Sequence, residues 1–501
     1  MKQLYVLLFS LLLFASPLAK AQSQSIHAEE MTRYHKYNFK TDAEYDRALG
    51  RDTEALRATR RTGTKASTQR TGERLGKKVF GWHPYWQGET WNTYDFSNLS
   101  TVAYFSYEVN PSTGGYSNLR SWETTGLIEA AHAAGTKVVL TVTNFGSANN
   151  ASILNDATRR ETLISTLISV VKARNGDGVN IDFETVGSAE RAALTSFMNT
   201  LSDRFHTEIP GSRVSIALPG LYSATNAFDV AAMTQVDDFL IMGYDYWYAG
   251  SSTAGPVAPL APSSWSYWGP TLNLTKSVDG YLTALPASKL LLALPYYGRR
   301  WATSTDAIGS TATTQNSKVA SVSRTYAAAK AEIAANGYTR QWNSQGSVPY
   351  YVYQENGQWF QTFYDDAESL GLKYDLVNTK GLAGIGIWAL GYDNPAVNPE
   401  LNNLLRTKFP PNVLSAGEEI STKDKNLAYP NPVARGQKVF VKASAPGTAV
   451  SVSLQDAVGR TNKVALAADG SFDTSALAPG LYFLTVSSPK ASATYRIVVA
   501  D

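Results

Sequence analysis

Short runs of β-branched and aromatic residues recur through the middle of the chain, and stretches with helical spacing separate them. Eight runs are predicted strands, which begin at Val79, Thr101, Lys137, Gly178, Arg213, Asp237, Lys289 and Leu382. One intervening helix shows a single apolar face at 3.6-residue spacing, formed by Leu194, Phe197, Met198, Leu201 and Phe205. Eight strands that alternate with helices predict an α/β fold, a parallel (β/α)8 TIM barrel over residues 78–410.

The interval between the seventh and eighth predicted strands, about residues 299–381, is much longer than the others. It contains a predicted helix over residues 323–337, followed by two alternating aromatic runs. Asn356-Gly357 between these runs is a strong signal for a type I′ hairpin. We therefore expect a small α+β insertion, which would follow the C-terminal end of a strand and form one wall of a cleft at the barrel mouth.

The pattern changes again after residue 410. Residues 411–426 are a predicted linker, and residues 427–501 show short alternating runs separated by Gly and Pro, which predict a small C-terminal β-sandwich. All eleven tryptophans lie between Trp82 and Trp388, so this C-terminal part lacks the indole platforms usual in carbohydrate-binding modules.

The first 77 residues contain two further segments. Residues 1–21 have a lysine, a short apolar run and an Ala-Lys-Ala ending, which predict a signal peptide cleaved before Gln22. The apolar run is shorter than the roughly 20 residues that span a bilayer, and no later stretch predicts a transmembrane segment in the mature chain. Residues 22–77 are a polar N-terminal extension whose composition favours a mobile leader or spacer, with a short helix possible between residues 42 and 57.

Composition and charge exclude several classes of function. Hydrophobic residues make up 44% of the chain and charged residues 17%, which is typical of a folded protein. The net charge is +3, but residues 1–21 carry +2 and residues 22–78 carry +5, so the remaining 423 residues carry −4 and nucleic acid is not an expected partner. The chain has no cysteine and only five histidines without HExxH spacing, so we expect no metal site and no cofactor.

The candidate chemical centre is the strand sequence DGVNIDFE. Alternate residues of a strand share a face, so Asn180, Asp182 and Glu184 are expected to point into the barrel together. Burying two acids costs several kcal/mol unless they are paired, and barrel enzymes carry their chemistry at the C-terminal strand ends, where Glu184 falls. A structural ion-pair network is the alternative interpretation.

These residues carry a family resemblance. DGVNIDFE resembles the DxxDxDxE motif of glycoside hydrolase family 18, the chitinases and their relatives, with Asn180 in place of the middle Asp. MGYDYW from Met242, LPYYGRRW from Leu294, and Trp388 in GIGIWALGYD resemble other motifs of the family, over about residues 78–409. The third strand has TVTNFG where the family often has SxGG, which resembles the branch that includes peptidoglycan-acting glucosaminidases.

The resemblance implies a retaining hydrolysis in which the 2-acetamido group of the sugar is the nucleophile. Glu184 would be the acid and then the base, Asp182 would orient the acetamido group, and Tyr244 would hydrogen-bond its carbonyl. Trp388 would be the floor on which the sugar stacks. Further substrate-binding candidates near the strand ends are Asn180, Asp245, Tyr85, Asn144, Met242, Tyr296 and Arg299.

The expected function is therefore that of a secreted glycosidase, a chitinase that cleaves β-1,4 bonds next to N-acetylglucosamine in a polysaccharide or glycan. An endo-β-N-acetylglucosaminidase acting on N-glycans or peptidoglycan stays open, because these substrates present the same acetamido group. A noncatalytic chitin-binding lectin is a third alternative, against which the retained Glu184 argues.

The C-terminal part resembles a second family. NLAYPNPV, PGLYFLTV and the final YRIVVAD resemble the sorting domain of the type IX secretion system, although the usual basic ending is replaced by Asp501. A generic β-sandwich accessory domain is the alternative. Together with the signal peptide, the resemblance implies passage through the periplasm, contact with the secretion machinery, and a secreted or cell-surface location.

Overall fold

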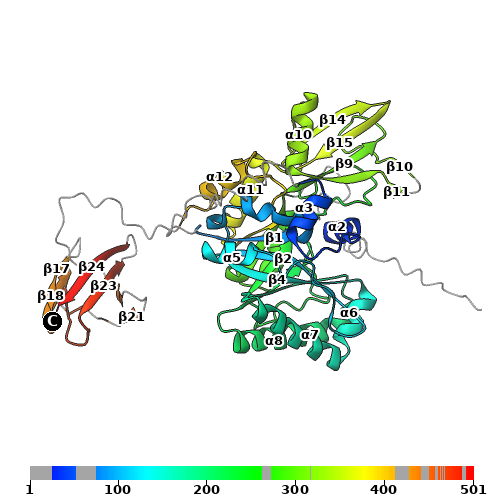
Figure 1. Ribbon diagram of the computed structural model, residues 1–501. Coiled ribbons are helices and arrows are strands. Elements are labelled where there is room, and N and C mark those ends of the chain that lie inside the picture. Colours follow the sequence, from blue (N-terminus) through cyan, green and yellow to red (C-terminus); the bar gives the residue numbers. More distant parts are fainter. Residues whose placement is uncertain are drawn as a thin grey trace, which may run out of the picture. The chain divides into compact units, whose positions relative to one another are not determined.

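The computed structural model describes residues 25–51, 75–261, 272–315, 318–411 and most of 428–500. The predicted signal peptide, residues 1–21, lies outside the described residues, as does almost all of the predicted linker. The chain forms two compact units (Figure 1). The first unit ends at Pro411 and the second begins at Asn412.

Eight parallel strands of the first unit form a closed barrel. In spatial order they are β1 (Lys78–Pro84), β16 (Gly384–Trp388), β8 (Leu290–Pro295), β7 (Asp238–Met242), β6 (Arg213–Leu218), β5 (Gly178–Glu184), β4 (Lys137–Phe145) and β2 (Thr101–Val109), and β2 pairs with β1 to close the ring. The short β3 (Tyr116–Asn118) pairs antiparallel with the end of β2. The predicted TIM barrel is confirmed, with each strand at its expected place in the sequence.

Helices lie outside the strands and bury one apolar face each. They are α5 (Leu127–Ala133), α6 (Ser147–Leu154), α7 (Ala157–Ala173), α8 (Arg191–Glu208), α9 (Leu274–Leu282), α11 (Ala367–Thr379) and α12 (Glu400–Lys408). The 3-10 turns are η1 (Tyr85–Thr93), η2 (Phe96–Asn98), η3 (Ser188–Glu190) and η4 (Ala287–Lys289). The five apolar residues predicted on one helix face are all buried on α8.

The predicted insertion is a five-stranded antiparallel sheet with one helix (Figure 1). The strands, in order, are β12 (Ser321–Thr325), β9 (Tyr297–Thr303), β15 (Gln358–Phe363), β14 (Val348–Glu355) and β13 (Gln341–Asn343), and the helix is α10 (Tyr326–Asn336). A separate short pair is formed by β10 (Thr314–Gln315) and β11 (Lys318–Val319). Asn356 and Gly357 join β14 to β15 with φ angles of 49° and 80°, the positive values that a type I′ turn requires.

The second unit consists of two sheets around a small apolar core, as the predicted β-sandwich requires. One sheet contains β17 (Ala428–Tyr429), β19 (Lys438–Val441) and β22 (Ser471–Asp473). The other contains β18 (Val433–Ala434), β24 (Ser492–Ala500), β23 (Gly480–Ser487), β20 (Ser451–Asp456) and β21 (Thr461–Asn462). In neither unit does a described helix have the length and apolarity needed to cross a membrane.

Residues 25–51, here called the N-terminal segment, form α2 (Ile26–Tyr34) and α3 (Asp42–Ala48), with Ser25 and Thr41 at the helix starts. Both helices lie against the barrel (Figure 1), and Ile26, His27 and Tyr45 are fully buried. The prediction of a mobile leader is therefore wrong for these residues. Several of the polar side chains that suggested a solvated spacer, among them His27, Glu30 and Asp42, form hydrogen bonds with the barrel.

Candidate active site

Strand β5 places two acids at the barrel mouth. Asp182 and Glu184 point to the same side of the strand, and their exposed fractions are 0% and 2%. Asn180 lies one step deeper, where its Oδ1 accepts a hydrogen bond from Trp82 Nε1 at 2.9 Å and its Nδ2 donates to Ser215 Oγ at 3.0 Å. Asn180 is thus held by the barrel interior beneath the acids.

Strands β7 and β16, on the other side of the mouth, supply the predicted tyrosine, aspartate and tryptophan. Tyr244 and Asp245 follow β7, and Asp245 has a φ of 59° and accepts a hydrogen bond from Tyr297 Oη at 2.6 Å. Trp388 ends β16 and is fully buried, and the ring of Phe105 lies nearly perpendicular to it, at an interplanar angle of 76° and a centroid distance of 4.9 Å. An indole, a phenol and two carboxylates thus surround one point.

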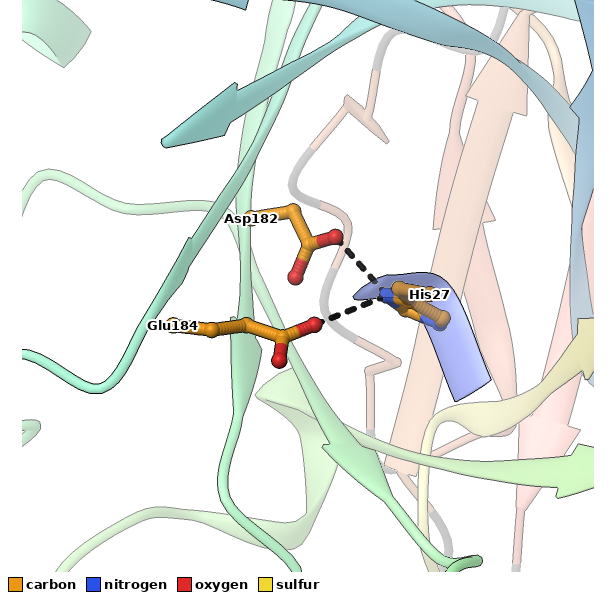
Figure 2. A group of neighbouring side chains, drawn as sticks. All are labelled: His27, Asp182 and Glu184. Carbon is orange, nitrogen blue, oxygen red and sulfur yellow. Dashed lines mark hydrogen bonds and ion pairs between the residues drawn. The ribbon is translucent and has the colours of Figure 1, made fainter. Parts of the chain in front are cut away.

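His27 of the N-terminal segment occupies that point. Its Nδ1 lies 2.8 Å from Asp182 Oδ2 and 3.3 Å from Glu184 Oε1 (Figure 2). Its Nε2 lies 2.9 Å from Tyr244 Oη, and its ring centroid is 3.8 Å from that of Trp388. The imidazole therefore contacts all four groups at once.

The surroundings of His27 favour its charged form. Burial alone lowers the pKa of His27, but the charge of Asp182 and the hydrogen bonds to Asp182 and Glu184 outweigh it and raise the pKa from 6.5 to about 10. Within the described residues, His27, Asp182 and Glu184 are also close enough together to hold a metal ion, because one ligand atom of each lies within 4.8 Å of the others. A doubly protonated imidazole has no lone pair for a metal, so the arrangement is better suited to an ion pair.

The environment of Glu184 suits a general acid. Burial, followed by the charge of Asp182, raises the pKa of Glu184, so its protonated form persists closer to neutral pH. Among the described residues, no group donates a hydrogen bond to Asp182 Oδ1. Buried carboxylate oxygens without partners are rare, and this one is available to a ligand.

A cavity of about 260 Å³ opens beside Glu184, between the loops that follow β6 and β7. Met242, Tyr244, Asp245 and Trp247 line it, so the predicted residue Met242 lies at the site.

The other predicted binding residues contact side chains other than the two acids, although Asn144 lies on β4 directly beside Phe183 of β5. Arg299, on β9 of the insertion, is fully buried and forms an ion pair with Glu29. Asn144 donates to Asn150 Oδ1 at 3.0 Å, and the ring of Tyr85 contacts that of Tyr45 at a centroid distance of 5.3 Å.

Tyr296 is the predicted residue that the structure separates from the mouth. Its Oη lies 3.3 Å from that of Tyr374 on α11, outside the ring of strands. Its position directly after β8 suggested a contact with substrate, but the phenol points to the helix layer.

Sequence reasoning missed His27, Glu29 and Glu30. They lie in a polar stretch with no recognisable motif, and they reach the site only through contacts with residues more than 150 positions away. Trp388 Nε1, for example, donates to Glu30 Oε2 at 3.1 Å.

Comparison with known families adds to this geometry. Residues 78–393 match the model of glycosyl hydrolases family 18, which is more than half of the chain. The chain belongs to this family. It is a family 18 glycosidase of the chitinase type, and the two acids of β5, the tyrosine after β7 and the tryptophan at the end of β16 lie within the matched residues.

Individual relatives are distant. The chain is 27% identical to di-N-acetylchitobiase of Mus musculus over 334 residues, 62% of this chain and 82% of that protein. It is 26% identical to the cortical fragment-lytic enzyme of Bacillus subtilis over 286 residues, 54% of this chain and 61% of that protein. The Group IV chitinase of Ostrinia furnacalis shares the fold, with a TM-score of 0.58 and 20% identity over 66% of this chain and 99% of that one.

The C-terminal unit has a family of its own. Residues 427–500 match a secretion system C-terminal sorting domain. This family 18 glycosidase therefore carries a domain for type IX secretion, which exports proteins to the cell surface or beyond it.

Proposed function

We propose that this family 18 enzyme is a chitinase that cleaves β-1,4 bonds next to N-acetylglucosamine by substrate-assisted catalysis. The observation that carries the proposal is the spacing of Asp182 and Tyr244, which contact the two nitrogens of one imidazole at 2.8 and 2.9 Å. An acetamido group is also planar and also has two polar atoms, an N–H that can donate to Asp182 and an oxygen that can accept from Tyr244. The same two side chains can therefore hold it.

The steps follow from this placement. Glu184 donates its proton to the glycosidic oxygen while the acetamido oxygen attacks the anomeric carbon, so the glycosidic bond breaks and an oxazolinium ring forms. Asp182 accepts a hydrogen bond from the amide N–H and stabilises the positively charged ring, and Tyr244 donates a hydrogen bond to the acetamido oxygen. Water then attacks the anomeric carbon while its bond to the acetamido oxygen breaks, Glu184 takes the proton of the water, and the acetamido group is restored with the β configuration retained. Trp388 supports the sugar from below.

The choice of chitin over the other substrates rests on the relatives. Their names include a chitobiase and a chitinase, although a cortical fragment-lytic enzyme is among them. An endo-β-N-acetylglucosaminidase acting on peptidoglycan or N-glycans is the second candidate. A lectin is disfavoured because the proton donor Glu184 is retained.

The proposed cellular route has two stages. The signal peptide at residues 1–21 would carry the chain into the periplasm, and the C-terminal domain would then engage the secretion machinery. The proposed domain limits are 78–410 for the barrel and 427–501 for the sorting domain, joined by a linker.

A substrate panel tests the proposed function. Because His27 fills the site, the chain without residues 22–51 is incubated with chitotetraose, its fully deacetylated counterpart, an N-glycan and peptidoglycan fragments. We expect rapid cleavage of chitotetraose with a β-anomeric product by proton NMR, and a rate at least about 1,000-fold lower without the N-acetyl groups, since the nucleophile is then missing.

The outcomes are distinct. Comparable cleavage of the deacetylated tetramer would refute substrate assistance. Faster cleavage of the N-glycan or peptidoglycan than of chitotetraose would assign the enzyme to the second candidate function.

A further inference from the structure

The N-terminal segment lies in the catalytic site of its own chain. At its start, the backbone N–H of Ile26 donates to Asp245 Oδ2 at 2.6 Å, and His27 follows between the acids and Trp388. Ile26 and His27 are both fully buried, so the first turn of α2 lies inside the mouth. A sugar and this turn cannot occupy the mouth together.

His27 contacts the groups that the mechanism assigns to the acetamido part of an N-acetyl sugar. Its Nδ1–H donates to Asp182, as the amide N–H of the substrate would, and its Nε2–H donates to the hydroxyl oxygen of Tyr244, which would instead donate to the acetamido oxygen. Its ring lies on Trp388 in place of the sugar ring. The imidazole thus imitates the reacting part of the substrate, with a positive charge that resembles the oxazolinium ion.

The rest of α2 holds this position. Glu29 forms an ion pair with the buried Arg299 of the insertion, and Glu30 accepts a hydrogen bond from Trp388 Nε1. Tyr34, at the end of the helix, stacks on Trp86 at a centroid distance of 5.0 Å. The helix therefore contacts two walls of the mouth and the indole floor.

Helix α3 binds the barrel at a second place, outside the mouth. Asp42, at the first turn of α3, accepts hydrogen bonds from Ser121 Oγ and Thr125 Oγ1, each at 2.6 Å, and from Trp91 Nε1 at 2.9 Å. Tyr45 is fully buried beside Tyr85. Two helices joined by seven residues thus bind the barrel at separate places.

We propose that residues 25–51 are a built-in inhibitor, which occupies the sugar site as a substrate mimic and keeps the enzyme inactive until the segment leaves. This inference rests on the proposed function, because the imitated contacts are those of an N-acetyl sugar. It assigns a regulatory role to a part of the chain that lies before the family match.

The barrel can be complete without the segment. The family match begins at residue 78, and 66% of this chain covers 99% of the Ostrinia furnacalis chitinase. The contacts of α2 with the mouth include hydrogen bonds and an ion pair, which water and a sugar can replace, together with the packing of Ile26 against the barrel core. Removal of the segment should therefore expose the mouth and leave the barrel folded.

Docking of the segment should weaken as pH rises. The charged and titratable groups around the imidazole are Asp182, Glu184, Tyr244, Asp245, Glu29, Glu30 and Arg299. Docking raises the pKa of His27 from 6.5 to about 10, so this contribution is complete below pH 6.5 and is lost progressively up to about pH 10. Burial raises the pKa of Glu30 from 4.5 to about 7. Docking therefore becomes less favourable as Glu30 ionises, so Glu30 also weakens docking when the pH rises.

A synthetic peptide of residues 25–51 tests this pH dependence. Its inhibition constant against the chain without residues 22–51 should rise by at least about tenfold between pH 6 and pH 8. A constant that is flat or falls over this range would contradict a charged His27 between the acids.

The main test compares four chains that all lack residues 1–21: the otherwise intact sequence, the chain that also lacks residues 22–51, His27→Ala and His35→Ala. His35 is the matched control, because it lies directly after α2 but is exposed. We expect kcat/KM for chitotetraose to increase at least about 100-fold on deletion and about tenfold to 100-fold in His27→Ala, which loses charged hydrogen bonds. His35→Ala should behave like the intact chain, and equal kcat/KM for the intact and deleted chains would overturn the inference.

A binding measurement separates the inference from the proposed function. If no chain cleaves any N-acetylated substrate, the proposed function fails, and calorimetric titration of the deleted chain with the 25–51 peptide decides the inference. Binding that weakens at least tenfold with His27→Ala in the peptide, and does not weaken with His35→Ala, supports occupation of the site. Absence of binding, or equal binding of the three peptides, refutes it. Circular dichroism of the deleted chain verifies that the barrel is folded.

Discussion

Glu184→Gln, introduced into the chain without residues 22–51, is expected to lower kcat on chitotetraose by at least about 1,000-fold while KM changes little. Glutamine has nearly the shape of glutamate, so the sugar should still bind. Its amide cannot donate a proton to the glycosidic oxygen or accept one from water, and general acid–base catalysis contributes about 100-fold to 10,000-fold in each such step. Steady-state kinetics, with calorimetry for binding, measure both effects.

Glu190→Gln is the control for this change. Glu190 lies at the end of η3, six residues after Glu184, and its Oε1 accepts a hydrogen bond from Asn155 at 3.3 Å outside the site. Its substitution should change kcat less than twofold. A kcat within tenfold of the parent in Glu184→Gln would remove Glu184 from the role of acid.

Asp365→Asn is expected to destabilise the barrel unit by about 3–5 kcal/mol, because it leaves a buried lysine without its counter-ion. Asp365 follows β15 and forms an ion pair with Lys373 of α11, whose side chain is completely buried. Ser369 Oγ also donates to Asp365 at 2.7 Å. Burial already lowers the pKa of Lys373 despite the charge of Asp365. An asparagine offers only a neutral acceptor, so the ammonium loses most of its compensation.

Denaturant unfolding followed by tryptophan fluorescence measures this loss. All eleven tryptophans lie between residues 82 and 388, so the signal reports on the barrel unit alone. Asp375→Asn is the matched control, since Asp375 lies on the same helix and pairs with Lys408 at 2.6 Å on the surface, where a pair contributes about 0–1 kcal/mol. Adding Lys373→Met to Asp365→Asn should restore most of the stability. Equal destabilisation by the two aspartate substitutions would contradict the role of burial.

Local patterns predicted the barrel well for a physical reason. Strands buried on both faces need β-branched and aromatic runs, and the run from Lys137 to Phe145 became β4 at those residues. Likewise, the Asn356-Gly357 turn depends only on its own backbone angles. Both signals lie within a few neighbouring residues.

The chemistry of the acids was predicted in part. The alternation along β5 correctly brought Asp182 and Glu184 to one side. It could not show that the amide of Asn180 is taken by Trp82 and Ser215, because these partners come from β1 and β6. Pairings between strands depend on the closed barrel and leave no local trace.

The docking of the N-terminal segment was the largest difference from the prediction. The segment has the polar composition of a solvated spacer, and its side chains find partners only on a surface that the barrel creates. His27, for instance, meets Asp182 across 155 positions of sequence. Composition indicates whether a segment can fold by itself, but it does not show whether another part of the same chain offers a complementary surface to which the segment can bind.

The covalent connection between α2 and the barrel changes how the enzyme would respond to dilution. A separate inhibitor dissociates when an exported enzyme spreads into a large volume, whereas an attached one stays at an effective concentration on the order of 1 mM at any enzyme concentration. Export by itself would therefore leave the enzyme inhibited. A cut in the chain between Arg51 and Lys78 would end the attachment, let the freed piece diffuse away, and make the onset of activity irreversible.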